Sequence, residues 1–279
     1  MAISIPKTAG RCLQKIAQDA RWALNNDGAV GDSEAEELED TLQFLDGHGQ
    51  LDRLLPRLRD DMRARDSALA EARAGRFLAS LGFLITAWEP PSPTGRPGDL
   101  LIRWSNISVF TEVKGPDWEG ELSHDEKVGE RKASGKFLNG EARPASPVQI
   151  PFDVIRRNIL PKFDESRPNM AVLVDNLWIS PASARGVVDG HVEDFFGQPG
   201  SGLLGGLLLL SVDRPAGMPV RNVSNFYSNS SALPSCQLPV GAVSALTRMA
   251  ERDATQKRTE SLAWKHDRIT MLASVAKRL

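Results

Sequence analysis

A chain of 279 residues, 41% of them apolar, is long enough to bury a substantial core, and its net charge of −2 argues against a surface coated with phosphate-binding groups. Its two cysteines, Cys12 and Cys236, lie far apart and fit no disulfide or zinc-ligand pattern, which is typical of a reducing cytoplasm. No apolar run is long enough to span a bilayer, and the first residues lack the apolar segment of an export signal. The sequence therefore predicts a folded, cytoplasmic protein that does not enter a membrane.

Helical patterns come first along the chain and strand-like patterns follow. Residues 1–60 are predicted to form a helical N-terminal extension, and residues 61–81 a further helix that ends before Gly82, because glycine favours the left-handed backbone that closes a helix. Alternating apolar residues then predict strands, with a proline- and glycine-rich loop between the first two. These strands are expected over residues 83–88, 99–104, 107–114, 169–179 and 206–214.

The segments between the later strands are less regular. Residues 115–144 are rich in glycine and charge, which predicts a functional or mobile loop. Residues 151–168 predict a helix disturbed at Pro161, and residues 187–197 a helix or a loop. The serine- and asparagine-rich residues 225–235 predict a flexible polar segment.

The order helix, strand, strand, strand, helix, strand predicts an α/β fold with a mixed central sheet flanked by helices, over residues 61–239. A C-terminal helical segment is predicted over residues 240–279. The helical extensions at the two ends are candidate contacts for a homodimer or for a protein partner.

Two acidic residues interrupt the apolar pattern of neighbouring strands. Counting outward from a two-residue turn at residues 105–106 places Asp99 directly opposite Glu112, and facing residues of an antiparallel pair have Cβ atoms about 4.5 to 5.5 Å apart. The period of two also puts Glu112 and Lys114 on one face of the sheet. Carboxylates this close repel each other unless a cation or a proton lies between them. Mg²⁺ or Mn²⁺ suits such oxygen ligands, and Lys114 could orient or help to deprotonate a metal-bound water and compensate negative charge.

Glu71 is a third acidic candidate. It falls nearly on the same helical stripe as Ala74, Leu78 and Leu81, so it is expected to face the sheet. An unpaired carboxylate is costly to bury there. Glu71 is therefore expected either to complete the metal site or to pair with a base such as Arg103.

At these residues the sequence resembles the PD-(D/E)xK nuclease superfamily, which has the restriction-endonuclease-like fold. The match consists of Glu71 in EARAGRFLASLGF, Asp99 in RPGDLLI, and Glu112 with Lys114 in VFTEVKG. The Pro-Asp pair of the motif is spread over Pro97, Gly98 and Asp99, but the acid keeps its place at the start of the strand.

The resemblance implies hydrolysis of phosphodiester bonds. It implies a divalent metal, Mg²⁺ or Mn²⁺, bound by Asp99, Glu112 and either Glu71 or the carbonyl of Val113, with Lys114 assisting the attacking water. In such nucleases a helix after the motif often adds a basic or amide side chain that binds substrate. Four residues compete for that role: Gln149, Arg156, Arg157 and Lys162.

The functional prediction is therefore a metal-dependent nuclease that acts on DNA in preference to RNA, in restriction, defence or repair. The alternative is a catalytically inactive protein of the same fold that serves as a binding or interaction module. The sequence contains no Gly-x-Ser-x-Gly elbow and no phosphate-cradling glycine-rich motif, which argues against a serine hydrolase and an NTPase.

Overall fold

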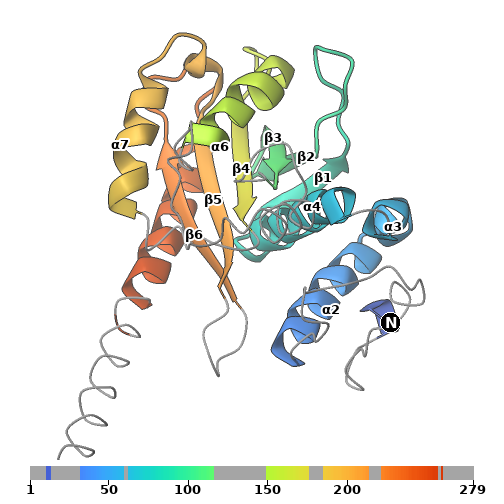
Figure 1. Ribbon diagram of the computed structural model, residues 1–279. Helices are drawn as coiled ribbons and strands as arrows, with labels where there is room; N and C mark the ends of the chain where they lie inside the picture. The colour runs from blue at the N-terminus through green and yellow to red at the C-terminus, as the bar shows by residue number, and fades with distance from the viewer. Residues whose placement is uncertain are drawn as a thin grey trace, which may run out of the picture.

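The computed structural model describes residues 11–13, 32–59, 62–115, 149–175, 185–213, 221–256 and 259 (Figure 1). Its first part is helical: α2 (Asp32–Gly47), α3 (Leu51–Arg59) and α4 (Met62–Ser80) precede the sheet. A short helix, α6 (Gln149–Val154), is followed directly by the π-helical turn η2 (Ile155–Ile159) and the 3₁₀ turn η3 (Leu160–Lys162). Residues 240–256 form a C-terminal helix. The remaining elements are β1 (Leu84–Trp88), β2 (Leu100–Trp104), β3 (Ile107–Lys114), β4 (Asn169–Asp175), α7 (Arg185–Phe196), η4 (Ser201–Leu203), β5 (Gly206–Asp213) and β6 (Arg221–Ser228).

The strands form one six-stranded mixed sheet in the order β1-β2-β3-β4-β5-β6. The neighbouring pairs β1–β2 and β2–β3 are antiparallel, the pairs β3–β4 and β4–β5 are parallel, and β6 is antiparallel to β5. The connections from β3 to β4 and from β4 to β5 run in the same direction across the sheet. Right-handed crossovers therefore place α6 and α7 on the same face of the sheet. Residues of α6, η2 and α7 accordingly share one buried cluster with the sheet.

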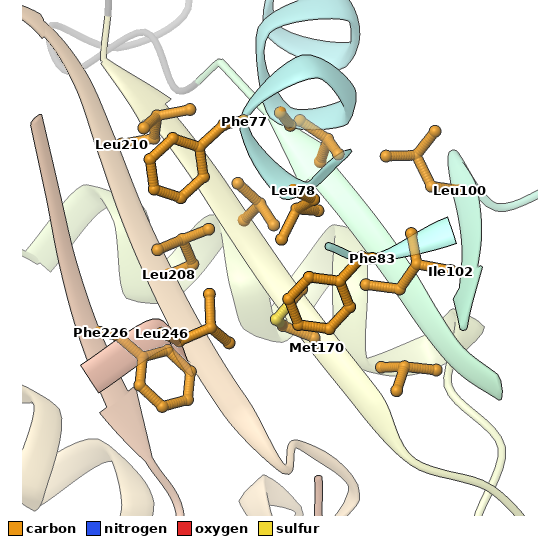
Figure 2. Close-up of a cluster of buried hydrophobic side chains, with 14 of the residues drawn as sticks. Phe77, Leu78, Phe83, Leu100, Ile102, Met170, Leu208, Leu210, Phe226 and Leu246 are labelled. Atoms are coloured by element: carbon orange, nitrogen blue, oxygen red, sulfur yellow. The ribbon is translucent and has the colours of Figure 1, made fainter. Parts of the chain in front are cut away.

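The other face of the sheet carries the largest buried cluster. Figure 2 shows Phe77 and Leu78 of α4 on the same side of the sheet as Met170 of β4 and Leu208 and Leu210 of β5, and all five belong to this cluster. The C-terminal helix adds its own apolar stripe to the same cluster, through Ala242, Leu246 and Ala250. The predicted α/β fold class, with a mixed central sheet flanked by helices, is confirmed.

The two helices α2 and α3 pack on α4 through a separate apolar cluster. Figure 1 shows the three helices on one side of the molecule. A buried ion pair fixes this contact: Nη2 of Arg73 donates to Oε2 of Glu37 at 2.7 Å. Burial alone would raise the pKa of Glu37, but the Arg73 guanidinium outweighs it and the pKa is lowered. The helical N-terminal region, α2 and α3, thus packs on α4, the helix that carries Glu71.

The five predicted strands are present, and the predicted helix over 61–81 is α4, closed by Gly82 with φ of 93°. The expected disturbance at Pro161 is also found, because Pro161 lies in the 3₁₀ turn η3 rather than in an α-helix. Residues 116–148, which hold almost all of the predicted charged loop, lie outside the described residues. None of the described helices combines the length and the apolar character needed to cross a membrane.

The flexible polar segment predicted over residues 225–235 was wrong at its start, which belongs to the sixth strand. Two polar side chains of this strand, Ser224 and Asn225, are buried and hydrogen-bonded. Asp253 of the C-terminal helix accepts bonds from the backbone N–H and the hydroxyl of Ser224, each at 2.7 Å. Asn225 donates to the Tyr227 hydroxyl, which donates to Asp189 of α7 at 2.8 Å. Buried polar residues that find partners in distant elements hide the apolar alternation of a strand.

Candidate active site at the end of the β2–β3 hairpin

The β2–β3 hairpin has the register expected from the sequence. Trp104 pairs with Ile107 across a two-residue turn, and Leu100 pairs with Thr111, so the next pair outward is Asp99 with Glu112. Asp99 directly precedes β2, and Glu112 lies near the end of β3. The hairpin therefore brings the two carboxylates to the same edge of the sheet.

Lys114 joins the two acids. Its Nζ donates to Oδ2 of Asp99 at 3.1 Å, to Oε2 of Glu112 at 3.3 Å and to the carbonyl of Val113 at 2.8 Å. Asp99 is held in place by the backbone, because its Oδ2 also accepts the N–H of Val113 at 2.7 Å. Burial would lower the pKa of Lys114, but the charges of Asp99 and Glu112 outweigh it and raise the pKa. Lys114 is thus an ammonium between two carboxylates.

Glu112 is the most deeply buried member of the site, with no exposed surface. Burial, and then the negative charge of Asp99, raise its pKa to about 7, although Lys114 and Lys162 both act in the opposite direction. Its Oε1 is buried and has no hydrogen-bond partner in the described part of the chain. A buried carboxylate oxygen without a partner is costly, and binding a cation would satisfy it.

Lys162, one of the four competing basic and amide residues, reaches the acids. Its Nζ donates to Oε2 of Glu112 at 2.8 Å and to the carbonyl of Pro97 at 3.0 Å. The helix over residues 149–162 changes from α to π to 3₁₀ before it reaches this lysine, and such irregular turns are frequent at functional sites. The sequence did not distinguish Lys162 from its competitors.

Two of the other candidates lie elsewhere. Arg156 stacks over the Phe195 ring of α7 and donates to Asp153 at 3.2 Å, beside a groove of about 370 Å³ between α6 and α7. Arg157 is exposed. The structure therefore does not bring these two arginines into contact with the acids. Gln149 is the first residue of α6, and its side chain lies outside the described part of the chain.

Glu71 is buried on α4, and its partner is not the predicted Arg103, which is exposed on β2. Oε1 of Glu71 accepts Nη2 of Arg57 at 2.6 Å, and Arg53 approaches the other oxygen at 3.8 Å. Burial raises the pKa of Glu71, the Arg57 hydrogen bond opposes this, and the charge of Asp99 raises it further. Glu71 therefore interacts electrostatically with Asp99, and Arg57 and Arg53 of α3 already lie beside its carboxylate as counter-charges.

The donor set fits a metal that keeps most of its own water. Among the described residues, no group of three or more histidine, cysteine, aspartate or glutamate side chains is placed to hold an ion. Mg²⁺, however, binds commonly through one or two carboxylates and completes its shell with water and phosphate oxygens. Asp99, Glu112 with its unsatisfied Oε1, and the Val113 carbonyl match that smaller set of ligands.

Gly98 precedes Asp99 at a point where the backbone packs closely against the site. A Cβ at this position would lie 2.3 Å from Cζ of Phe110 and 3.0 Å from Oε1 of Glu112. The chain between Pro97 and Asp99 passes so close to the buried Phe110 ring that only glycine fits. This close approach holds Asp99 and Glu112 together.

Gly98→Ala is therefore expected to lower the free energy of unfolding by about 1 to 3 kcal/mol, the usual effect of overpacking a core. The matched control is Gly190→Ala on α7, where a Cβ meets nothing within 4 Å and the change should be neutral or slightly stabilising. Urea unfolding of the two variants measures both effects. Equal stability of Gly98→Ala and the parent protein would contradict the close packing.

Comparison of this chain with family models, with curated proteins and with solved structures found no match, so the chemistry of the site rests on its own residues.

Proposed function

We propose that the chain is a divalent-metal-dependent nuclease that hydrolyses phosphodiester bonds. The observation that carries the proposal is the meeting of Asp99, Glu112 and Lys114 at one edge of the sheet, with the lysine ammonium in contact with both carboxylates. Repulsive carboxylates held together by a buried hairpin do not stabilise a fold by themselves, as the raised pKa of Glu112 indicates. Such an arrangement is typical of a functional site.

The order of elements supports the same proposal. α4, β1, β2, β3, α6 and β4 follow one another as helix, strand, strand, strand, helix and strand, with β4 parallel to β3. This order supports the proposed PD-(D/E)xK resemblance, with Glu71 on α4, Asp99 directly before β2 and Glu112 on β3. Following that resemblance, we propose DNA rather than RNA as the substrate, and restriction, defence or repair as the setting.

In the proposed reaction, Asp99, Glu112 and the Val113 carbonyl would hold Mg²⁺ or Mn²⁺. The bound metal would supply a water of lowered pKa and would polarise the phosphate. Lys114, kept positive by its two carboxylates, orients the water and stabilises the negative charge that grows on the phosphate oxygens. Lys162 also balances the charge of Glu112, through the same carboxylate oxygen that Lys114 contacts.

A second candidate function is a catalytically inactive binding module. One observation favours it: Lys114 and Lys162 pair with Glu112, and Arg57 pairs with Glu71, so protein cations already compensate these acids. A member of the fold that had lost its metal would retain just such pairs. The two functions differ in whether the protein cuts nucleic acid or only binds a partner.

Purified protein incubated with supercoiled plasmid distinguishes them. Cleavage is expected in Mg²⁺ or Mn²⁺ and is expected to stop in EDTA, because the phosphate and the water are activated by the metal. An RNA of the same sequence, tested alongside, measures the preference for DNA. No cleavage in either metal would favour the binding module, and cleavage that persists in EDTA would point to a contaminating enzyme.

A further inference from the structure

Arg57, on α3 of the helical N-terminal region, has a geometry that the proposed chemistry does not yet use. Its Nη2 donates twice, to Oε1 of Glu71 at 2.6 Å and to the hydroxyl of Ser67 at 2.9 Å. Both acceptors belong to α4, so the guanidinium is fixed through one of its three nitrogens. No partner within the described ranges contacts Nε or Nη1, and the side chain is 35% exposed.

The neighbouring Arg53 is different. Its Nε donates to Gln50 at 2.8 Å, its Nη1 contacts Glu89, and its guanidinium stacks over Trp88. Its Nη2 is buried. Arg53 is therefore engaged in holding α3 against β1, whereas Arg57 presents unused donors towards solvent.

The location of Arg57 relates it to the candidate active site. Arg53, the neighbour of Arg57 on α3, approaches the same Glu71 at 3.8 Å and contacts Glu89, whose backbone N–H donates to the carbonyl of Asp99 at 3.1 Å. Asp99 is one of the two acids that meet at Lys114. Arg57 and Lys162 thus flank the acids, one from α3 and the other from η3. An oriented guanidinium with open N–H groups beside an acidic centre is suited to bind a phosphate that the acids alone would repel.

We propose that Arg57 binds a backbone phosphate of a nucleic acid beside the Asp99–Glu112 pair, and that Glu71 is the positioning residue that orients it. This inference rests on the proposed function for its substrate. It gives the helical N-terminal region a part in the site, and it gives the buried charge of Glu71 a purpose other than metal binding.

The test measures binding of a short fluorescein-labelled DNA duplex by anisotropy, in EDTA so that no cleavage occurs, over a series of KCl concentrations. Arg57→Gln is expected to weaken binding by about 10-fold and to make the slope of log K against log[KCl] shallower by about 1, since one phosphate contact is lost. Arg103→Gln removes the same charge from an exposed position on β2 and is the matched control. It is expected to leave both the affinity and the slope unchanged.

A second variant guards against misfolding. Arg57→Gln leaves the buried Glu71 without its main counter-charge, so the double variant Arg57→Gln/Glu71→Gln removes both charges together. The double variant is expected to melt near the parent protein and still to show the shallower slope. Arg57→Lys, which restores the charge without the planar donors, is expected to regain the slope but only part of the affinity.

The outcomes separate this inference from the proposed function. An Arg57-dependent slope in a protein that never cuts DNA would support the inference and reject the nuclease. A protein that cuts DNA, but whose Arg57→Gln and double variants bind with the parent slope, would overturn the inference and leave the nuclease intact. No binding of the duplex by the parent protein would also overturn the inference.

Discussion

Asp99→Asn is expected to lower the rate of metal-dependent DNA cleavage by about 1,000-fold, the size of effect typical for removal of one charged or hydrogen-bonding group from a catalytic centre. Asparagine retains an oxygen that can accept the Val113 N–H, so the hairpin should keep its geometry. What it lacks is the negative charge that would bind the metal and hold Lys114. Initial rates of plasmid cleavage in Mg²⁺ measure the effect.

The matched control for this variant is Asp40→Asn. Asp40 lies on α2 and forms an exposed ion pair with Arg76, the kind of pair that contributes little to stability. Its substitution should leave both cleavage and melting temperature unchanged. Cleavage by Asp99→Asn at the parent rate would remove Asp99 from the mechanism.

Glu112→Gln is expected to make the metal-free protein more stable above about pH 7, by up to about 3.5 kcal/mol, while it abolishes cleavage. The pKa of Glu112 is about 7 in the folded state, against 4.5 for the unperturbed group, so the folded protein retains a proton that the unfolded chain has lost. The stability from this group is complete below the unfolded pKa and is lost as the pH rises through the folded one. Each pKa unit corresponds to about 1.4 kcal/mol.

Urea unfolding in EDTA, at about pH 5 and about pH 8, tests the sign of this effect. The gain in stability of Glu112→Gln over the parent should be larger at the higher pH. In a separate series without EDTA, added Mg²⁺ should stabilise the parent protein but not the variant. The matched control is Glu165→Gln at an exposed acid, which should leave the free energy of unfolding nearly unchanged, as is usual for a surface substitution. A Glu112→Gln protein that becomes less stable than the parent as the pH rises would show that the charge of Glu112 stabilises the fold.

The sequence was sufficient to predict the centre of the site because that centre depends on local geometry. The register of a hairpin follows from a two-residue turn, and the turn at residues 105–106 was readable, so the approach of Asp99 and Glu112 could be counted out. The face shared by Glu112 and Lys114 follows from the period of two. Five of the six strands, the helix before them and the mixed sheet were predicted from local patterns of the same kind.

The rest depends on contacts between distant segments. The partner of Glu71 was open because α3, which supplies Arg57, is placed against α4 only by the apolar contacts of the helical region. Lys162 could not be chosen over Arg156 because the change from α to π to 3₁₀ helix rotates each side chain to a direction that a regular helix would not give. β6 was missed because Ser224 is buried through its bonds to Asp253, far away in the sequence.

The most direct test of the account is a crystal structure of the protein soaked in Mn²⁺, with the ion located by its anomalous scattering. The account predicts one peak within ligand distance of Asp99 and Glu112, at about 2.0 to 2.2 Å, with the Lys114 ammonium still beside it. Mn²⁺ bound at other residues only, under conditions in which the protein cuts DNA, would contradict it.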